Sequence, residues 1–285
     1  MIIHVKTERP VTLRTYLRGV CGISARLLTR LKQIPGGITR NGVQIRSVDL
    51  VCDGDEIILQ LPNDTHLAAN PSLCVRIAYE SEQVVVYDKP QGMPVHPSVH
   101  HHTDTLGNAF AARYPELTFR PVNRLDSDTS GLCLIAKTAF SAHTLSGSVE
   151  KAYRALVCGE LTGDGTVDAP IARAEESIIT RCVRADGKAA VTHYHTEHFD
   201  GKYSHLSLAL ETGRTHQIRV HMAHIGHPLA GDRLYGGDCT DYQRHMLHCA
   251  ELSFTEPETG ARIRLVSVPW WSEGKNRGVT NESIN

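Results

Sequence analysis

Apolar residues recur along this 285-residue chain with two different periods. Over residues 13–20 and 27–34 they stand three or four positions apart, which is typical of two short amphipathic helices. Residues 73–79, 151–157 and 203–210 instead alternate apolar and polar side chains, and this pattern predicts strands with one buried face. The beginning of the chain is therefore expected to be helical, and the remainder to be rich in strands.

The helical beginning is predicted to be part of a separate unit at residues 1–62. Ser24 is a suitable N-cap for the second helix, and Pro35-Gly36-Gly37 is expected to end it. Asn41-Gly42 then lies between two short strand-like segments, which predicts a β-hairpin with a two-residue turn.

Polar segments mark the boundaries of this unit and of the next one. Residues 63–71 are polar and bounded by prolines, which predicts a linker to a larger domain at 72–270. Residues 271–285 are also polar and are predicted to form a flexible tail. One small and one large domain are a natural division for a chain of this length.

The first unit is basic, although the whole chain has a formal net charge of −1. Residues 1–62 contain nine Lys and Arg against five Asp and Glu. Arg26, Arg30 and Lys32 lie on the polar face of the second helix and are candidates for binding the phosphate backbone of a nucleic acid. The alternative is that these side chains only solvate an exposed helix face.

Cysteines and histidines give no sign of a metal site. The eight cysteines stand singly, which favours free thiols in a reducing cytoplasm over disulfides or zinc ligands. The run His100-His101-His102 has no fixed ligand geometry, so we expect no metal there. No apolar run has the length of a membrane helix, and the N-terminal residues lack the apolar core of a signal peptide.

A polar loop before an apolar run is the strongest candidate for a catalytic centre. Residues 121–131 are rich in Asp, Ser and Thr and end in Gly, and the short apolar run 132–137 follows. This composition predicts a tight loop at the start of a buried strand. Asp126 stands next to Arg124 and Leu125, an environment that can tune a carboxylate as a nucleophile or base. Capping of a turn is the simpler alternative for this Asp.

Three motifs resemble those of the RluA-type RNA pseudouridine synthases. The segment Arg124-Leu125-Asp126, followed by Asp128-Thr129-Ser130-Gly131-Leu132, is similar to the catalytic signature of that family. The strand at 151–157, with Tyr153, and the segment 212–222, with Arg219, are similar to its second and third motifs and follow in the same order.

The resemblance covers residues 72–270 and implies an α+β fold. A small S4-like RNA-binding module at 1–62 would be followed by a catalytic domain with a mixed, mainly antiparallel sheet flanked by helices and loops. The implied activity is that of an enzyme, an RNA pseudouridine synthase, which isomerises uridines in ribosomal RNA, or else in transfer RNA. We expect no cofactor, no membrane and no obligate protein partner, and a cytoplasmic location.

The resemblance also implies roles for single side chains. Asp126 would be the essential catalytic residue, Tyr153 would pack against the target base, and Arg219 would pair with Asp126. Arg124 would fill the gap that the extruded uridine leaves in the RNA, and Leu229 would wall the pocket.

Two alternatives to this enzyme stay open. Asn123 stands where the family usually has His, and the loss of an imidazole would fit an RNA-binding protein that keeps the fold without the reaction. Asp126 and Asp128 would instead suit the carboxylate pair of a glycosidase, although a turn role is sufficient for Asp128. The motifs report the shared chemistry and do not specify which RNA or which uridine is modified.

Overall fold

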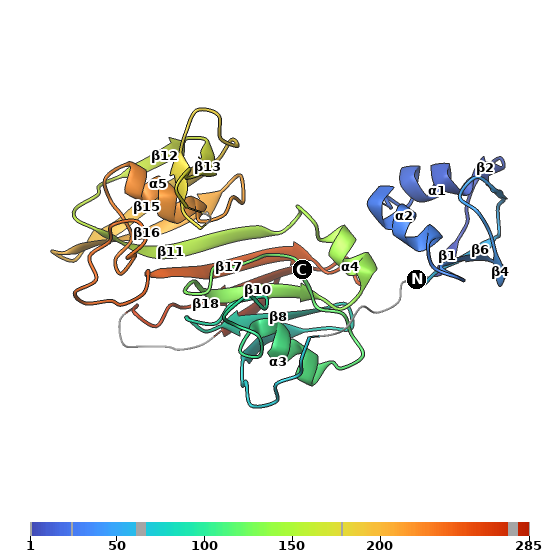
Figure 1. The fold of residues 1–285 in the computed structure, drawn as a ribbon, viewed down its shortest axis with the longest axis horizontal. Coiled ribbons are helices and arrows are strands. Elements are labelled where there is room, and N and C mark those ends of the chain that lie inside the picture. Colours follow the sequence, from blue (N-terminus) through green and yellow to red (C-terminus); the bar gives the residue numbers. More distant parts are fainter. Residues whose placement is uncertain (1, 24, 61–66, 178, 273–278, 285) are drawn as a thin grey trace. The chain divides into compact units, whose positions relative to one another are not determined.

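The chain divides into two compact units, Met1–Asp64 and Thr65–Asn285 (Figure 1). The structure is a computed structural model, and it describes residues 2–23, 25–60, 67–177, 179–272 and 279–284. Three sequence expectations fall at least partly outside these residues: the N-cap Ser24, the linker at 63–71 and the tail at 271–285.

The small unit packs two helices against short strands (blue in Figure 1). Helix α1 (Leu13–Gly19) begins where the Thr12 hydroxyl accepts a hydrogen bond from the N–H of Thr15, and helix α2 spans Ala25–Lys32. Four strands pair in the order β1-β6-β3-β4, and β2 pairs with β5. The strands are β1 (Ile2–His4), β2 (Val11–Thr12), β3 (Ile38–Arg40), β4 (Val43–Gln44), β5 (Leu50–Val51) and β6 (Glu56–Leu59).

The hairpin between β3 and β4 turns at the residues that the sequence indicates. Asn41 and Gly42 have φ angles of 49° and 82°, and positive φ at both central residues is the requirement of a type I′ turn. The two helices and the hairpin expected within residues 1–62 are therefore present.

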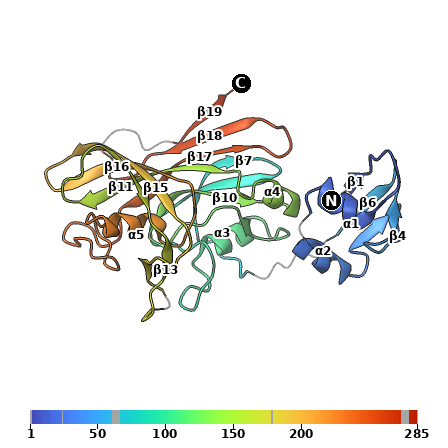
Figure 2. The same ribbon diagram turned by 90° about the horizontal axis from the view of Figure 1, so that it is seen from above.

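The large unit is built on one long sheet (Figures 1 and 2). Its strands pair in the order β12-β15-β16-β11-β17-β10-β8-β7, while β18 pairs with β17 and β19, and β9 pairs with β10. The bounds are β7 (Arg76–Glu80), β8 (Val84–Lys89), β9 (Arg120–Pro121), β10 (Ser130–Ala136), β11 (Glu150–Cys158), β12 (Asp164–Asp168), β15 (Val191–Phe199), β16 (Tyr203–Leu210), β17 (Leu247–Thr255), β18 (Arg262–Ser267) and β19 (Val279–Ile284). A separate pair is formed by β13 (Ile171–Arg173) and β14 (Arg181–Val183).

One pair of strands makes this sheet mixed. Strands β10 and β17 run parallel, while the other pairs of the sheet, within the described residues, are antiparallel. The close approach of β10 to β17 depends on Gly131, since a Cβ there would overlap with the backbone of Cys249. Gly131 also has a φ of 103°, which favours glycine. The mixed, mainly antiparallel sheet expected for the catalytic domain is confirmed.

Few helices accompany this sheet, and two of them cover one of its faces. These two are α3 (Leu106–Arg113) and α5 (Gln217–His224), which Figure 2 shows beneath the strands, while α4 spans Ala139–Thr144. Helix α3 begins with a capping box in which Thr105 and Asn108 bond each other's backbone. In the part of the chain that the structure describes, no helix combines the length and apolar character needed to cross a membrane.

The end of the chain differs from the sequence expectation. Residues 271–285 are predicted to be a flexible tail, but Val279–Ile284 form strand β19, which pairs antiparallel with β18 from Ser267↔Val279 to Arg262↔Ile284. Backbone groups make these bonds whatever side chains the strand carries, so a polar sequence does not exclude a strand at a sheet edge.

Candidate active site

Asp126 lies in a tight loop that leads into strand β10. The N–H of Thr129 donates to the carbonyl of Asp126 at 3.1 Å and closes the turn. Asn123, with 6% of its surface exposed, donates from its side-chain amide to the carbonyl of Leu132 at 3.1 Å and accepts from the N–H of Leu134 at 2.7 Å. These two bonds extend the pairing of β9 with β10 and fasten the loop to the sheet.

A buried ammonium group holds the same loop from another side. Nζ of Lys89 donates to the carbonyls of Pro90 at 2.9 Å, Met93 at 2.7 Å and Ser127 at 2.9 Å. Burial lowers the pKa of Lys89 to about 8, while nearby thiol and carboxylate groups oppose the shift. The Asp126 loop is therefore fixed by contacts on both flanks.

Helix α5 brings a guanidinium to Asp126. Nη1 of Arg219 donates to Oδ2 of Asp126 at 3.1 Å, while Nε and Nη2 donate to the two carboxylate oxygens of Asp232 at 2.7 and 2.8 Å. Burial alone would lower the pKa of Arg219, but the hydrogen bonds and charges of Asp232 and Asp126 outweigh it and raise the pKa. The guanidinium also lies over the ring of Tyr235, 5.0 Å from its centroid. Arg219 is a permanent cation in this site.

His216 stands at the start of α5 with an unusual backbone. Its φ of 58° is in the left-handed region, which is uncommon for a residue other than glycine. This conformation directs Nδ1 to the hydroxyl of Tyr235 at 2.8 Å and Nε2 to Oδ2 of Asp126 at 3.8 Å.

The hydrogen bonds of Tyr235 favour one tautomer of His216. The Tyr235 oxygen accepts from the N–H of Arg181 at 3.0 Å, which leaves its own hydrogen available for Nδ1 of His216 at 2.8 Å. With Nδ1 as the acceptor, the hydrogen of the neutral ring is on Nε2, which faces Asp126. Burial lowers the pKa of His216, partly offset by the charge of Asp126, and this favours the neutral ring.

Tyr153 is carried into the site by β11. Only 8% of its surface is exposed, and the pairing of β11 with β17 shifts register between Ala152 and Tyr153. Such a bulge re-aims the side chains next to it. Burial raises the pKa of Tyr153 well above its ordinary value, and the neighbouring Cys249 and Asp126 add to the effect. The phenol therefore keeps its proton and presents a neutral ring.

These side chains meet around a small cavity of about 60 Å³. Four of the residues singled out in the sequence line it together: Arg124, Asp126, Tyr153 and Arg219. Arg124 is exposed, whereas Arg219 and Tyr153 are buried. The remaining lining residues are Leu125, Thr129, Leu210, Arg214, His216, Gln217, Ile218 and Leu247.

Other candidate residues lie elsewhere. Leu229 is fully buried in the main core and is not among the residues that line the cavity. Its carbonyl accepts a hydrogen bond from the N–H of Asp232 at 3.1 Å, so Leu229 begins the turn that contains Asp232. Arg30 and Lys32 are exposed on α2 of the small unit, and Arg26 belongs to the same helix. Their contribution to RNA binding stays a prediction.

A search of the described residues finds no group of three or more His, Cys, Asp and Glu placed to hold a metal ion. The eight cysteines are free thiols. Burial raises the pKa of Cys133 and of Cys249, next to Tyr153, to about 12, so both thiols are protonated.

Comparison with known proteins agrees with this geometry. A family model described as RNA pseudouridylate synthase matches residues 83–224. The chain is 40% identical to the "Uncharacterized RNA pseudouridine synthase YjbO" of Bacillus subtilis, an alignment that covers 89% of this chain and 94% of that protein. The chain belongs to the RNA pseudouridine synthase family. It is also 38% identical to ribosomal large subunit pseudouridine synthase D of Pseudomonas aeruginosa, over 80% of this chain and 79% of that protein.

A solved structure shows the same pseudouridine synthase fold. Human RNA pseudouridylate synthase domain containing 1 matches with a TM-score of 0.60 and 25% sequence identity, over 74% of this chain and 90% of the human chain. The fold expected from the sequence motifs is therefore confirmed for the large unit.

Three residues of this candidate site were missed in the sequence: His216, Asp232 and Tyr235. His216 lies within the third family motif, and the other two lie in the Gly-rich segment 226–237. The sequence does not show that Asp232 binds Arg219 or that Tyr235 bonds His216, because these pairs form only when the 229–238 turn folds onto α5.

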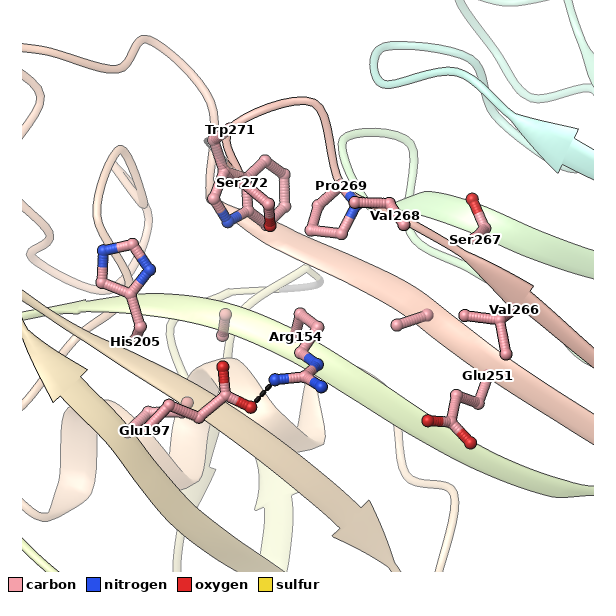
Figure 3. A pocket seen from close by; sticks show the side chains of 13 residues that line it. Arg154, Glu197, His205, Glu251, Val266, Ser267, Val268, Pro269, Trp271 and Ser272 are labelled. Carbon is pink, nitrogen blue, oxygen red and sulfur yellow. Dashed lines mark ion pairs between the residues drawn. The ribbon is translucent and has the colours of Figure 1, made fainter. Parts of the chain in front are cut away.

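The opposite face of the synthase sheet has a hollow of its own (Figure 3). Arg154 follows Tyr153 on β11 and therefore points to the other face. The hollow has a volume of about 250 Å³, and Arg154 pairs there with Glu197, while Glu251 pairs with Arg264 at 2.8 Å. Because these charges are compensated in pairs, the hollow offers no excess of positive charge to a polyanion.

Proposed function

We propose that this chain isomerises uridine to pseudouridine within RNA and that Asp126 is its catalytic residue. The observation that carries the proposal is the 3.1 Å contact between Asp126 and Arg219 on the wall of a cavity that Tyr153 also lines. Ribosomal RNA is the favoured substrate over transfer RNA, because the related protein of Pseudomonas aeruginosa is named a ribosomal large subunit pseudouridine synthase.

The reaction rearranges one nucleotide without adding atoms. The bond between N1 of uracil and C1′ of the ribose breaks, the base turns, and C5 bonds to C1′; the proton lost from C5 is balanced by the proton that N1 gains. A carboxylate that attacks the sugar or the base can link the two halves of this reaction. Asp126 must attack as a carboxylate, and Arg219 places a cation 3.1 Å from its Oδ2.

Neighbouring side chains limit how Asp126 can turn. Oδ2 faces Nη1 of Arg219 at 3.1 Å and Nε2 of His216 at 3.8 Å, which leaves Oδ1 for the attack on the substrate. Asp232 holds Arg219, and Tyr235 holds His216. We assign these four residues as positioning residues, which fix the carboxylate before RNA binds.

The target uridine must leave the RNA stack before it can react. The ring of Tyr153 offers a flat, uncharged surface for the extruded base. Arg124 is exposed beside this cavity, where it can fill the gap left in the RNA. Leu229 lies too deep in the core to contact a base directly, and its proposed part is to support the Asp232 turn.

Residues 1–62 are proposed to be an S4-like module that holds the RNA by its phosphates, in the cytoplasm where ribosomal RNA is modified. The exposure of Arg30 and Lys32 supports this. Replacing both by Ala should reduce the salt dependence of RNA binding, by about 0.7 in log–log slope for each phosphate that these side chains bind in the wild type. An unchanged slope would argue against the module.

The glycosidase alternative is disfavoured by Asp128. Its Oδ1 lies 3.6 Å from Nε of Arg244, and it is not among the residues that line the Asp126 cavity. A paired catalytic carboxylate would have to share the cavity with Asp126.

Incubation of the full chain with unmodified bulk RNA, followed by nucleoside analysis, tests the proposed reaction. We expect new pseudouridine from the wild type and none from Asp126→Asn, while Asp126→Asn still binds RNA. The exposed carboxylate of Asp186 provides a control, and Asp186→Asn should keep the activity. Free uracil would indicate a hydrolase, and binding without modification would indicate an inactive RNA-binding protein.

A further inference from the structure

Another hollow, of about 450 Å³, opens beside the Asp126 cavity. Arg219 lines both the cavity and this hollow. Three guanidiniums and two carboxylates surround the hollow, so it has an excess of positive charge. Burial and the nearby charge of Arg219 lower the pKa of His245 to about 4, so this ring adds no charge at neutral pH. The lining residues are Asp128, Arg219, Gly231, Asp232, Arg233, Leu234, Gln243, Arg244 and His245.

Arg244 has a fixed place at this hollow. A Cβ at Gly92 would overlap with Nη1 of Arg244, so the absence of a side chain at Gly92 makes room for the guanidinium. Asp128 holds Arg244 from another direction, with 3.6 Å between Oδ1 and Nε. Half of the Arg244 side chain is nevertheless exposed. The cation is therefore oriented and still accessible to a ligand.

Arg233 is the second oriented cation. Its Nη2 donates to Oε1 of Gln243 at 2.8 Å, a neutral partner that orients the guanidinium without neutralising it. The residue is exposed, and its backbone N–H is held by the carbonyl of Gly231 at 3.1 Å. It directly follows Asp232, so a ligand on Arg233 would contact the same turn that positions Arg219.

We propose that this hollow binds the nucleotide next to the extruded uridine, with its phosphodiester group on Arg233 and Arg244. The inference rests on the proposed function, since it takes the neighbouring cavity as the place of the target base. Planar guanidiniums match phosphate oxygens in pairs. The volume is within the range of about 300–1,000 Å³ found for small-molecule sites. The exposed side chain of Leu234 adds an apolar surface for the ribose or base.

Binding of a fluorescent oligouridylate to the full chain, measured by anisotropy over a range of salt concentrations, tests this site. Each phosphate contact to a single strand contributes about 0.7 to the slope of log affinity against log salt. Because the two guanidiniums share one phosphodiester group, we expect Arg233→Ala and Arg244→Ala each to reduce the slope by part of that amount and to weaken binding at low salt. Arg244→Lys keeps the charge and should retain the slope while binding more weakly than the wild type.

Arg76→Ala is the matched control, because Arg76 is exposed on β7 of the same unit and is not among the residues lining either hollow. Its slope should equal that of the wild type. Three results would overturn the site: unchanged slopes in the Arg233 and Arg244 variants, an equal reduction in the Arg76 variant, or no binding of the oligouridylate at low salt. If Arg244→Ala melts well below the wild type, Arg233→Ala and Arg244→Lys decide alone.

The proposed reaction and the proposed nucleotide-binding site can be disproved independently of each other. A chain that shows the expected slopes but forms no pseudouridine from bulk RNA would keep the binding site and lose the reaction. A chain that forms pseudouridine with slopes unaffected by Arg233 and Arg244 would keep the reaction and lose the site.

Discussion

Asp232 accepts two hydrogen bonds from Arg219, from Nε at 2.7 Å and from Nη2 at 2.8 Å. Asp232 is 1% exposed, and this bidentate contact determines the plane of the guanidinium. Nη1 is thereby directed to Asp126. The cation that contacts the proposed nucleophile is thus oriented by a second carboxylate, that of Asp232.

We expect Asp232→Asn to lower the rate of pseudouridine formation by about a hundredfold, since a shift of about 1 Å in a catalytic group has an effect of that size. The loss should appear in the rate at saturating RNA more than in the half-saturating RNA concentration. The free energy of unfolding should fall by about 3 kcal/mol, because a buried guanidinium loses its carboxylate. Single-turnover kinetics and thermal unfolding measure the two effects.

Asp186→Asn serves as the control for Asp232→Asn, because it removes a charge from the surface of the same unit. It should leave both the rate and the unfolding free energy close to those of the wild type. A wild-type rate in Asp232→Asn would show that Arg219 does not need this partner.

The bond from Tyr235 to His216 predicts a single tautomer for that ring. Nitrogen NMR of the wild type should show His216 protonated on Nε2 and not on Nδ1 at neutral pH. Tyr235→Phe removes the donor, and both tautomers should then be populated, with a reduced rate at saturating RNA. Tyr194→Phe, on β15, should leave the His216 signals unchanged.

A second variant separates the ring of His216 from its backbone. Asn tolerates the left-handed conformation that His216 adopts at a φ of 58°, so His216→Asn keeps the helix start and loses only the imidazole. Its rate should resemble that of Tyr235→Phe or be lower. A wild-type rate in His216→Asn would remove His216 from the set of positioning residues.

His245 is expected to make the free energy of unfolding depend on pH. Its Nε2 lies 2.9 Å from Oγ1 of Thr129, and burial followed by the charge of Arg219 lowers its pKa from 6.5 to about 4. As the pH falls from 6.5 towards 4, the unfolded chain takes up a proton that the folded chain does not. Stability should therefore fall over this range, by about 3 kcal/mol in total, and be unaffected by this group above pH 6.5.

Denaturant unfolding at several pH values measures this effect. His245→Gln should lose part of the stability at neutral pH and also lose much of the pH dependence between 6.5 and 4. His224→Gln changes an exposed ring and should keep the wild-type dependence. Equal pH dependence in the wild type and His245→Gln would contradict the assignment.

The alternation of apolar and polar residues predicted the long strands, because these strands bury one face. Residues 203–210 were expected to alternate, and in β16 Leu206 and Leu208 are buried with the half-exposed Ser207 between them. Strands β12, β13 and β14 were missed, since they are short and have few buried positions and so carry little periodic signal. Strand β19 was missed because it pairs through its backbone at an edge.

The sequence predicted the residues of the site only where a family motif included the residue and the resemblance implied its role. Asp126 and Arg219 are 93 residues apart, and the resemblance alone suggested that they meet. Asp232 and Tyr235 depend on a turn whose fold requires Gly231, where a Cβ would overlap with the carbonyl of Arg244. Such long-range fits leave no local pattern, so composition and periodicity could not predict them.

Asn123, where the resemblance to the RluA-type synthases leads us to expect His, has a structural task. Its side-chain amide donates to the carbonyl of Leu132 and accepts from the N–H of Leu134. Asn123 is not among the residues that line the Asp126 cavity. Asn123→Ala leaves both backbone groups without this partner in a buried place, which should lower the free energy of unfolding by about 2 kcal/mol or more. The rate of pseudouridine formation should fall with it, because the loop that carries Asp126 loses an anchor.

Asn123→His distinguishes a structural task from a catalytic one. An imidazole has one donor and one acceptor when neutral, so it can replace part of the amide's bonding to β10. If the position only anchors the loop, the variant should remain active and the rate should show no new titration near pH 6.5. A new titration in the rate profile, absent from the wild type and from Asn123→Ala, would instead place this side chain in the reaction.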